Sequence, residues 1–172
     1  MYAPVSALLT ALAKGSINFK QVLAFIDARY NFTPTAFSNG KQRNAATENQ
    51  GSAKIFSFAA LNNLNQLDTL ALFAEHYQAV KEHPEGTDHQ NIRQFIHNNW
   101  QGVRFDGQAL SPKSNIEQIN RQAAATYANG GTEFDDLVEE AAPEVVAQEP
   151  EADSVAPAAA VAAGAALASA EI

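Results

Sequence analysis

Helical spacing of apolar residues is the dominant pattern along most of the chain. Val5, Leu8 and Leu12 lie on one face of a first helix, which Gly15 ends. A second broad apolar face runs over residues 19–30 and predicts a second helix. Together with the segments that follow, this pattern predicts a mainly α protein.

The second helix has a polar start and a charged residue inside its apolar face. Ser16 or Asn18 can cap it, because a side-chain oxygen there accepts hydrogen bonds from the free amides of the first turn. Arg29 lies within the apolar face near the end of the helix. We expect a carboxylate or the terminal carbonyl groups to bind its guanidinium, and the helix dipole also favours a cation at that end.

Residues 33–50 lack a long apolar pattern. The segment 33–40 predicts a one-turn helix that Thr33 caps and Gly40 ends, with Pro34 in its first position. Residues 41–50 are polar and contain no large apolar side chain, so they predict a surface loop. Functional residues often lie on such loops.

Two further helices are predicted before the middle of the chain. Residues 53–61 fit a helix or a strand, and Ser52 as a natural N-cap favours the helix. Residues 65–82 give the clearest helical pattern of the chain. His76 and His83 lie on its polar side, so we expect both rings in solvent.

The densest polar cluster lies on a helix predicted over residues 88–98, with Thr87 or Asp88 as its N-cap. At 100° per residue, His89 lies inside the apolar face and Arg93 at its edge. Both side chains need partners from elsewhere in the chain, because an unsatisfied buried polar group costs roughly 1–3 kcal/mol. The apolar face also carries Ile92, Phe95, Ile96 and Trp100.

The pattern weakens after this helix. Residues 103–106 predict a short strand or an extended arm, with too few apolar residues for a sheet. Ser114 begins a helix that runs to about Tyr127 and has a thin apolar face, so we expect it to dock at the periphery.

These elements predict a single compact domain of about six helices with a short extended segment. We place the domain over residues 1–110 and the peripheral helix over residues 111–132. Residues 133–172 are acidic and rich in Ala and Pro, and they offer little apolar surface to offset the entropy of ordering. We therefore predict a disordered C-terminal segment.

Charge divides the chain at the same boundary. Residues 1–132 hold all 11 Lys and Arg with 9 acidic residues, whereas residues 133–172 hold no base and 10 acids. The dispersed bases of a domain with net charge +2 argue against nucleic-acid binding. No stretch reaches the roughly 18 consecutive apolar residues of a membrane span, so no membrane partner is predicted.

The sequence contains no motif for a cofactor or a metal. The absence of cysteine excludes disulfides, thiol nucleophiles and thiolate metal sites. Neither a phosphate-binding glycine loop nor a Gly-x-Ser-x-Gly elbow occurs. His76 and His83 have no evident third ligand, so we predict no metal site and no cofactor.

A candidate polar pocket forms if the polar loop converges on the His89 segment. It draws on Asp27, Asn39, Asn44, Asn49, Ser52, Asp88, His89, Asn91 and Arg93. The alternative is structural: a hydrogen-bonded core histidine, and an arginine that ties down a neighbouring loop. We favour the structural explanation, and the sequence does not decide whether the protein is an enzyme.

Several different short motifs follow one another along residues 19–110. They include Phe25-Ile26-Asp27, Thr33-Pro34-Thr35-Ala36-Phe37, Asn39-Gly40, Gly51-Ser52, Asp88-His89, Asn91-Ile92-Arg93 and Phe105-Asp106-Gly107. Taken together they resemble the HopJ type III effector protein family. The resemblance implies a bacterial protein delivered through a type III secretion system into a host cell, and it supplies no established active site or cofactor.

Three hypotheses for function follow. The leading one is a HopJ-like effector, or a relative in the bacterial cytoplasm, that binds a protein partner such as a host protein and exposes an apolar patch for it. The second is a small-ligand binder or enzyme with a pocket around His89 and Arg93. The third is a scaffold in which the acidic segment interacts, so that deleting residues 133–172 removes binding.

Overall fold

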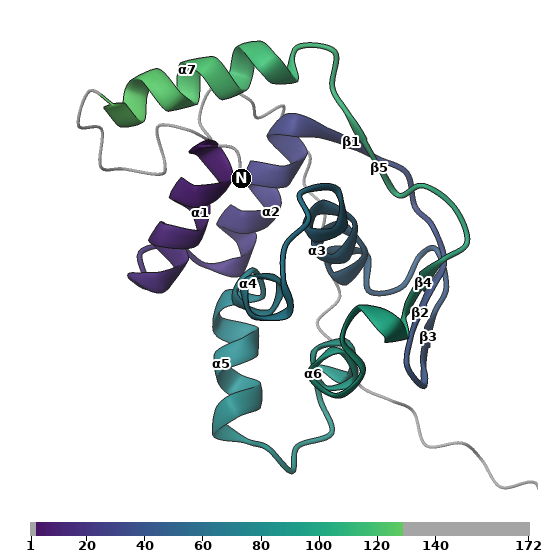
Figure 1. Ribbon diagram of the computed structural model, residues 1–172. Coiled ribbons are helices and arrows are strands. Elements are labelled where there is room, and N and C mark those ends of the chain that lie inside the picture. Colours follow the sequence, from purple (N-terminus) through teal and green to yellow (C-terminus); the bar gives the residue numbers. More distant parts are fainter. Residues whose placement is uncertain (1–2, 129–172) are drawn as a thin grey trace, which may run out of the picture.

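The computed structural model describes residues 3–128, which form seven helices and five short strands (Figure 1). This architecture confirms the predicted mainly α domain. The predicted disorder of residues 133–172 lies outside the described residues. The helices are α1 (Ala3–Ala13), α2 (Phe19–Arg29), α3 (Gln50–Leu61), α4 (Gln66–Ala71), α5 (Ala74–Glu82), α6 (Gln90–Gly102) and α7 (Ile116–Ala128). The strands are β1 (Tyr30–Phe32), β2 (Phe37–Asn39), β3 (Gln42–Asn44), β4 (Val103–Phe105) and β5 (Leu110–Pro112).

A cluster of aromatic rings around Phe56 of α3 forms the centre of the core. The Phe56 side chain is fully buried, and its ring centroid lies 5.0 Å from that of Phe95 and 5.4 Å from that of Phe73. The rings of Phe37 and Trp100 contact it from β2 and α6. Four rings from three parts of the chain therefore meet on one residue of the central helix.

The first two helices confirm the predicted caps. Gly15 follows α1 with φ of 65°, a conformation that glycine adopts without strain. Asn18 caps α2, since its side chain accepts from the Gln21 amide while the Gln21 side chain accepts from the Asn18 amide.

Arg29 ends α2 inside the core and is 2% exposed. Its Nη1 donates to the Phe25 carbonyl at 3.1 Å, its Nε donates to Asn120 Oδ1, and its guanidinium lies 3.6 Å from the centre of the Phe25 ring. Burial lowers the pKa of Arg29 to about 10, so the group stays charged at neutral pH. A terminal carbonyl thus binds this cation, as expected.

Residues 33–44 contradict the prediction. In place of a one-turn helix and a surface loop, the structure has β2 and β3 joined by a tight turn at Gly40-Lys41, and Asn44 is buried. Phe37 pairs with Asn44 on one side and with Phe105 on the other. Pairing with β4, far along the chain, overrides the local helix signals. The Phe37 ring also stacks on that of Phe105 at 5.1 Å.

The small strands form two sheets. β3, β2 and β4 pair antiparallel in that order, and β1 pairs antiparallel with β5. β4 falls within the extended segment predicted near residues 103–106, but it joins a sheet, contrary to expectation. Helix α6 packs against the three-stranded sheet and covers its inner side.

Three predicted helices differ in their bounds. Ser52 does not cap α3, which begins at Gln50 after Asn49 in a left-handed conformation. The helix predicted over residues 65–82 is broken between α4 and α5, where Leu72 and Phe73 are both buried.

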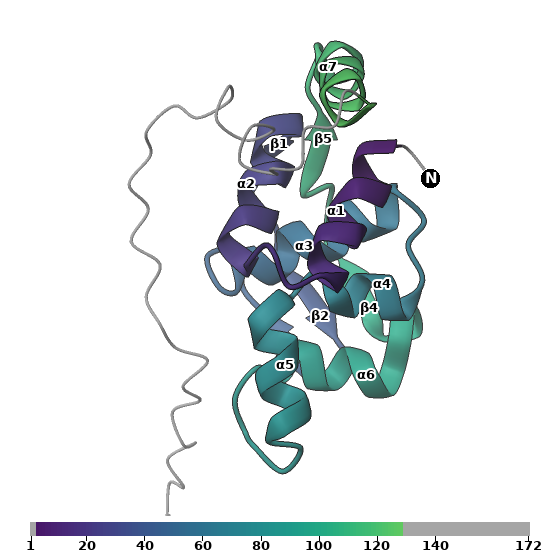
Figure 2. The same ribbon diagram turned by 90° about the vertical axis from the view of Figure 1, so that its left-hand side faces the viewer.

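Helix α6 starts later than predicted. His89, rather than Thr87 or Asp88, occupies its N-cap position, with a left-handed φ of 50°. Its buried side is also rotated, so that Asn91 is buried while Ile96 is 37% exposed. Helix α7 confirms the helix predicted from Ser114. It lies beside α1 at one end of the molecule (Figure 2), where its Ala123 is buried.

Replacing Phe56 by Ala should lower the free energy of unfolding by about 3–5 kcal/mol, because it removes the ring on which four others pack. Urea denaturation followed by circular dichroism measures this loss. Leu67→Ala is the control: Leu67 is 71% exposed, so its truncation should change the stability by no more than about 0.5 kcal/mol. Equal losses in the two variants would contradict the central role of Phe56.

Candidate functional site

Four asparagines of the predicted pocket meet in one hydrogen-bonded group, the asparagine cluster (Asn39, Asn44, Asn49 and Asn91). Asn44 and Asn91 exchange side-chain hydrogen bonds of 3.2 and 2.8 Å, and the Asn49 Nδ2 donates to Asn44 Oδ1 at 2.7 Å. The Asn39 Nδ2 donates to the Asn91 carbonyl at 2.6 Å. The polar loop and the start of α6 therefore converge.

The geometry of the asparagine cluster is that of a structural hydrogen-bond network that holds segments of the fold together. Asn39, Asn44 and Asn91 are at most 3% exposed, and their amides bond mainly to one another. The group ties the β2–β3 hairpin to the first turn of α6 and to the N-cap of α3. The Asn39 Oδ1 is buried without a hydrogen-bond partner among the described residues.

Arg93 lies on the other side of the α6 start and binds the preceding loop. Its Nη1 donates to the Pro84 carbonyl, its Nη2 to the His83 carbonyl and Asp88 Oδ1, and its Nε to the Asp88 carbonyl, all within 2.9 Å. A Cβ atom at Gly86 would lie 2.5 Å from Nη2, so glycine is needed where the loop passes over this group. These contacts are those of an arginine that ties down a loop.

Asp88 completes this loop as an ion pair with Arg93. The oxygen–nitrogen distance is 2.7 Å, and the carboxylate is about half exposed. The hydrogen bond from the Arg93 guanidinium holds the pKa of Asp88 below its usual value of 3.8, and the nearby His89 acts in the same direction. The carboxylate is thus ionised over the physiological pH range.

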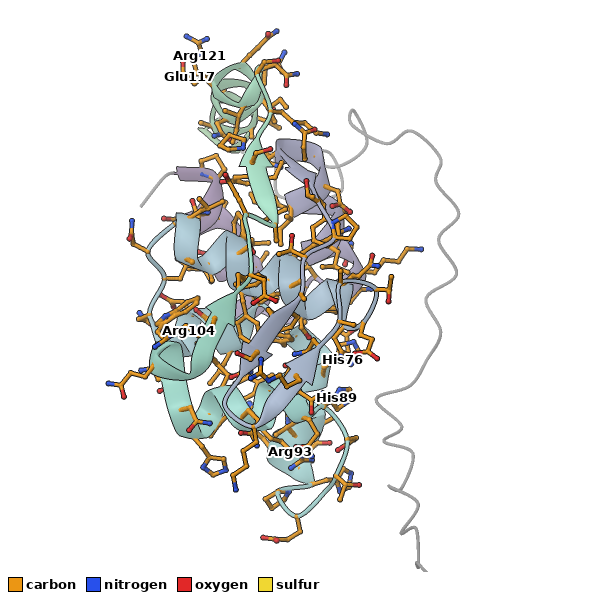
Figure 3. The ribbon with its side chains drawn as sticks, turned by 90° about the vertical axis from the view of Figure 1, so that its right-hand side faces the viewer. His76, His89, Arg93, Arg104, Glu117 and Arg121 are labelled. Atoms are coloured by element: carbon orange, nitrogen blue, oxygen red, sulfur yellow. The ribbon has the colours of Figure 1, made fainter. Side chains whose placement is uncertain are left out.

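His89 is half-buried at the surface, not enclosed in the core as predicted. Its side chain is 27% exposed, and its Nε2 lies 3.7 Å from Asp88 Oδ2. Its ring is 4.9 Å from that of His76, which in turn packs edge-on against Phe19 at 4.7 Å. In Figure 3, His76 lies just above His89, and Arg93 lies below both.

This arrangement corrects the prediction for His76. The ring is half-buried against α2 and α6, whereas His83 is exposed as expected. Helical periodicity placed His76 on the polar side of its own helix. The neighbouring sequence contains no signal that the distant Phe19 and His89 cover its ring. The Phe19–His76–His89 contact is therefore the feature of this region that sequence reasoning missed.

Asp27 and Ser52 lie outside the asparagine cluster. Asp27 Oδ2 pairs with Lys54 Nζ at 2.9 Å, and this ammonium also lies 5.1 Å from the centre of the Phe32 ring. In the described part of the chain, no hydrogen bond joins Asp27 or Ser52 to the four asparagines. The nine candidate residues thus separate into the asparagine cluster, the Arg93 loop, the Asp27–Lys54 pair, and Ser52.

An open concavity of about 530 Å³ lies beside the Arg93 loop and is lined by residues 82–88. It is the outer side of the segment that Arg93 holds. Within residues 3–128, no group of three or more His, Asp or Glu side chains is placed to hold a metal ion. The same residues include no helix long and apolar enough to cross a membrane.

Comparison with known proteins identifies the family. Residues 5–110 match the HopJ type III effector protein family, which is more than half of the chain. The chain belongs to the HopJ family. The match extends the predicted resemblance over residues 19–110 to include α1, and it ends at the first residue of β5.

A solved structure has a similar fold. The chain is 45% identical to a crystal structure described as the unknown function protein VPA0580, with a TM-score of 0.59. The similarity covers 66% of this chain and 97% of that protein. No curated protein matches the chain. The described domain therefore shares its architecture with a second protein of 45% sequence identity.

Replacing Asn44 by Ala should lower the free energy of unfolding by roughly 1–3 kcal/mol, because it leaves the buried Asn91 amide without its partner. Chemical denaturation measures the change. Asn31→Ala in β1 is a matched control, since Asn31 is exposed and its truncation should stay within about 0.5 kcal/mol. A loss no larger than that of the control would show that the asparagine cluster does not fasten the hairpin.

Replacing Asp88 by Asn should destabilise the protein at neutral pH but not in acid. The folded-state pKa of Asp88 is depressed, so its ionised form stabilises the folded state above the unfolded pKa of about 4, and this stabilisation disappears as the pH falls through the folded value. The urea midpoints of the wild type and the variant should therefore converge once the pH falls below the depressed folded-state pKa of Asp88. Glu85→Gln, in the same loop, is the control, and a gap that persists in acid would contradict the ion pair as its cause.

Proposed function

We propose that this HopJ protein is a type III effector-like protein whose helical domain acts by binding a protein of the host cell. Family membership over residues 5–110 supports the effector role. The contacts of the candidate pocket agree with a protein-binding role rather than catalysis. The polar groups of Arg93 and of the four asparagines form hydrogen bonds within the domain that stabilise its fold.

Two exposed aliphatic side chains on neighbouring helices, called the Leu67–Ile96 patch, support the proposal of protein binding. Leu67 is 71% exposed on α4 and Ile96 is 37% exposed on α6, two helices that pack together. Gln66 Nε2 joins them by donating to the carbonyls of Phe95 and Ile96 at 2.9 and 3.0 Å. Bare aliphatic side chains held on rigid helices are a feature of protein-interaction surfaces.

The effector role is tested by translocation. The full chain, fused to a reporter enzyme that is active only inside host cells, should give a signal when expressed in bacteria with an intact type III secretion system. Bacteria that lack the secretion ATPase provide the control. Equal signals from both strains, or none from either, would overturn the effector assignment.

The binding surface is tested by charge substitution. Leu67→Glu should abolish a partner complex isolated by cross-linking in host cells, because a carboxylate cannot be buried at an apolar contact without a large desolvation cost. Leu61→Glu is the matched control, since Leu61 is 46% exposed at the end of α3, on another helix. A partner that is retained by Leu67→Glu, or lost equally in both variants, would contradict the patch.

A further inference from the structure

The outer side of the β3–β2–β4 sheet carries a row of basic residues. Ser38 in the central strand β2 pairs with Arg43 of β3 on one side and with Arg104 of β4 on the other. Side chains alternate along a strand, and Phe37 and Asn39 are buried, so the three paired residues point outward. Figure 3 views the molecule from the side of this sheet, with Arg104 at its edge.

We call Ser38, Lys41, Arg43 and Arg104 the basic sheet face. Lys41 lies in the exposed turn between β2 and β3, at the end of these two strands. Arg43, Lys41 and Arg104 are exposed. The Ser38 hydroxyl, half-buried between the two arginines, makes no hydrogen bond with another described residue. The sheet therefore presents three cations and a free hydroxyl on a rigid support.

These cations lack acidic partners in the described part of the chain. Lys54 and Arg93 form the ion pairs with Asp27 and Asp88, whereas no carboxylate of residues 3–128 lies within 4 Å of Lys41, Arg43 or Arg104. The Arg104 Nη1 donates only to the Val103 carbonyl. Asp106, two positions beyond Arg104, forms no ion pair with it. The basic sheet face is thus left without neutralising charge.

The complementary charge lies in the same chain. Residues 133–153 contain nine Asp and Glu and no Lys or Arg. We propose that the basic sheet face is a docking surface for this acidic segment of its own chain. The contact is separate from the Leu67–Ile96 patch, and it does not depend on the proposed effector function.

Chain length allows the contact. Helix α7 ends at Ala128, on the far side of the molecule from the sheet (Figure 1). Residues 144–153 follow Ala128 by 16 to 25 positions, which span roughly 55 to 85 Å when extended. A domain of this size has a radius of gyration of about 14 Å, so the acidic segment reaches any point of its surface.

Arginine on an edge strand also discourages pairing with other chains, and both β3 and β4 are edges of the sheet. Edge protection requires no anion, whereas docking does. Salt and removal of the acidic charge distinguish these two roles. Screening of the charges by salt weakens docking of the acidic segment but does not affect edge protection.

The test is nuclear magnetic resonance of the full chain. Sodium chloride is raised from about 20 mM to about 500 mM, which shortens the Debye length from roughly 20 Å to roughly 4 Å. The amides of Ser38, Arg43 and Arg104 should shift with salt in the wild type. In a full-length variant with Glu144→Gln, Glu149→Gln, Glu151→Gln and Asp153→Asn, which neutralises every acid of residues 144–153, the same amides should show the high-salt positions at every salt concentration.

Reciprocal variants act as controls. Arg43→Gln with Arg104→Gln should move the amides of residues 144–153 to their high-salt positions, whereas Lys14→Gln with Arg121→Gln, two exposed bases elsewhere, should not. The shifts should also be independent of protein concentration. Sheet amides that ignore the acidic substitutions, an equal effect of both base pairs, or concentration dependence that indicates contact between copies would each overturn the proposal.

Discussion

Packing of aromatic rings around Phe56 is the interaction on which the rest of this structure depends. A fully buried ring on the central helix holds Phe73 from the α4–α5 pair and Phe95 from α6. It also contacts Phe37 of β2, which stacks on Phe105 of β4. Helices and sheet are therefore oriented by one apolar contact set, and the polar groups nearby take positions that this packing decides.

The polar clusters form hydrogen bonds with the buried amide and carbonyl groups that aromatic packing alone does not satisfy. The asparagine cluster satisfies buried amides where the hairpin meets α6, and Arg93 satisfies the carbonyls of the loop that leads into the same helix. Both sets of contacts surround His89, whose left-handed backbone starts α6. A region rich in amides, imidazole and guanidinium can look like a ligand site in sequence and serve the fold in structure. Surface features, the Leu67–Ile96 patch and the basic sheet face, are instead left unpartnered within the described domain.

Local signals predicted the elements that local physics controls. The Gly15 terminus, the Asn18 cap and the carbonyl partner of Arg29 all involve residues within one helical turn or its ends. The strands other than β4 and the break before α5 were missed. Their stability comes from partners such as Phe105 and from burial of Leu72 and Phe73, neither of which a window of neighbouring residues contains.

The sequence by itself determined the mainly helical class, the division of charge between residues 1–132 and 133–172, and membership of the HopJ family, because periodicity, composition and motif order need no coordinates. Only the tertiary structure decided that the four asparagines bind one another, that His89 stays at the surface against His76, and that Arg43 and Arg104 flank Ser38. The physical reason is that burial and strand register depend on which distant segments pack together, and helical periodicity describes each segment alone.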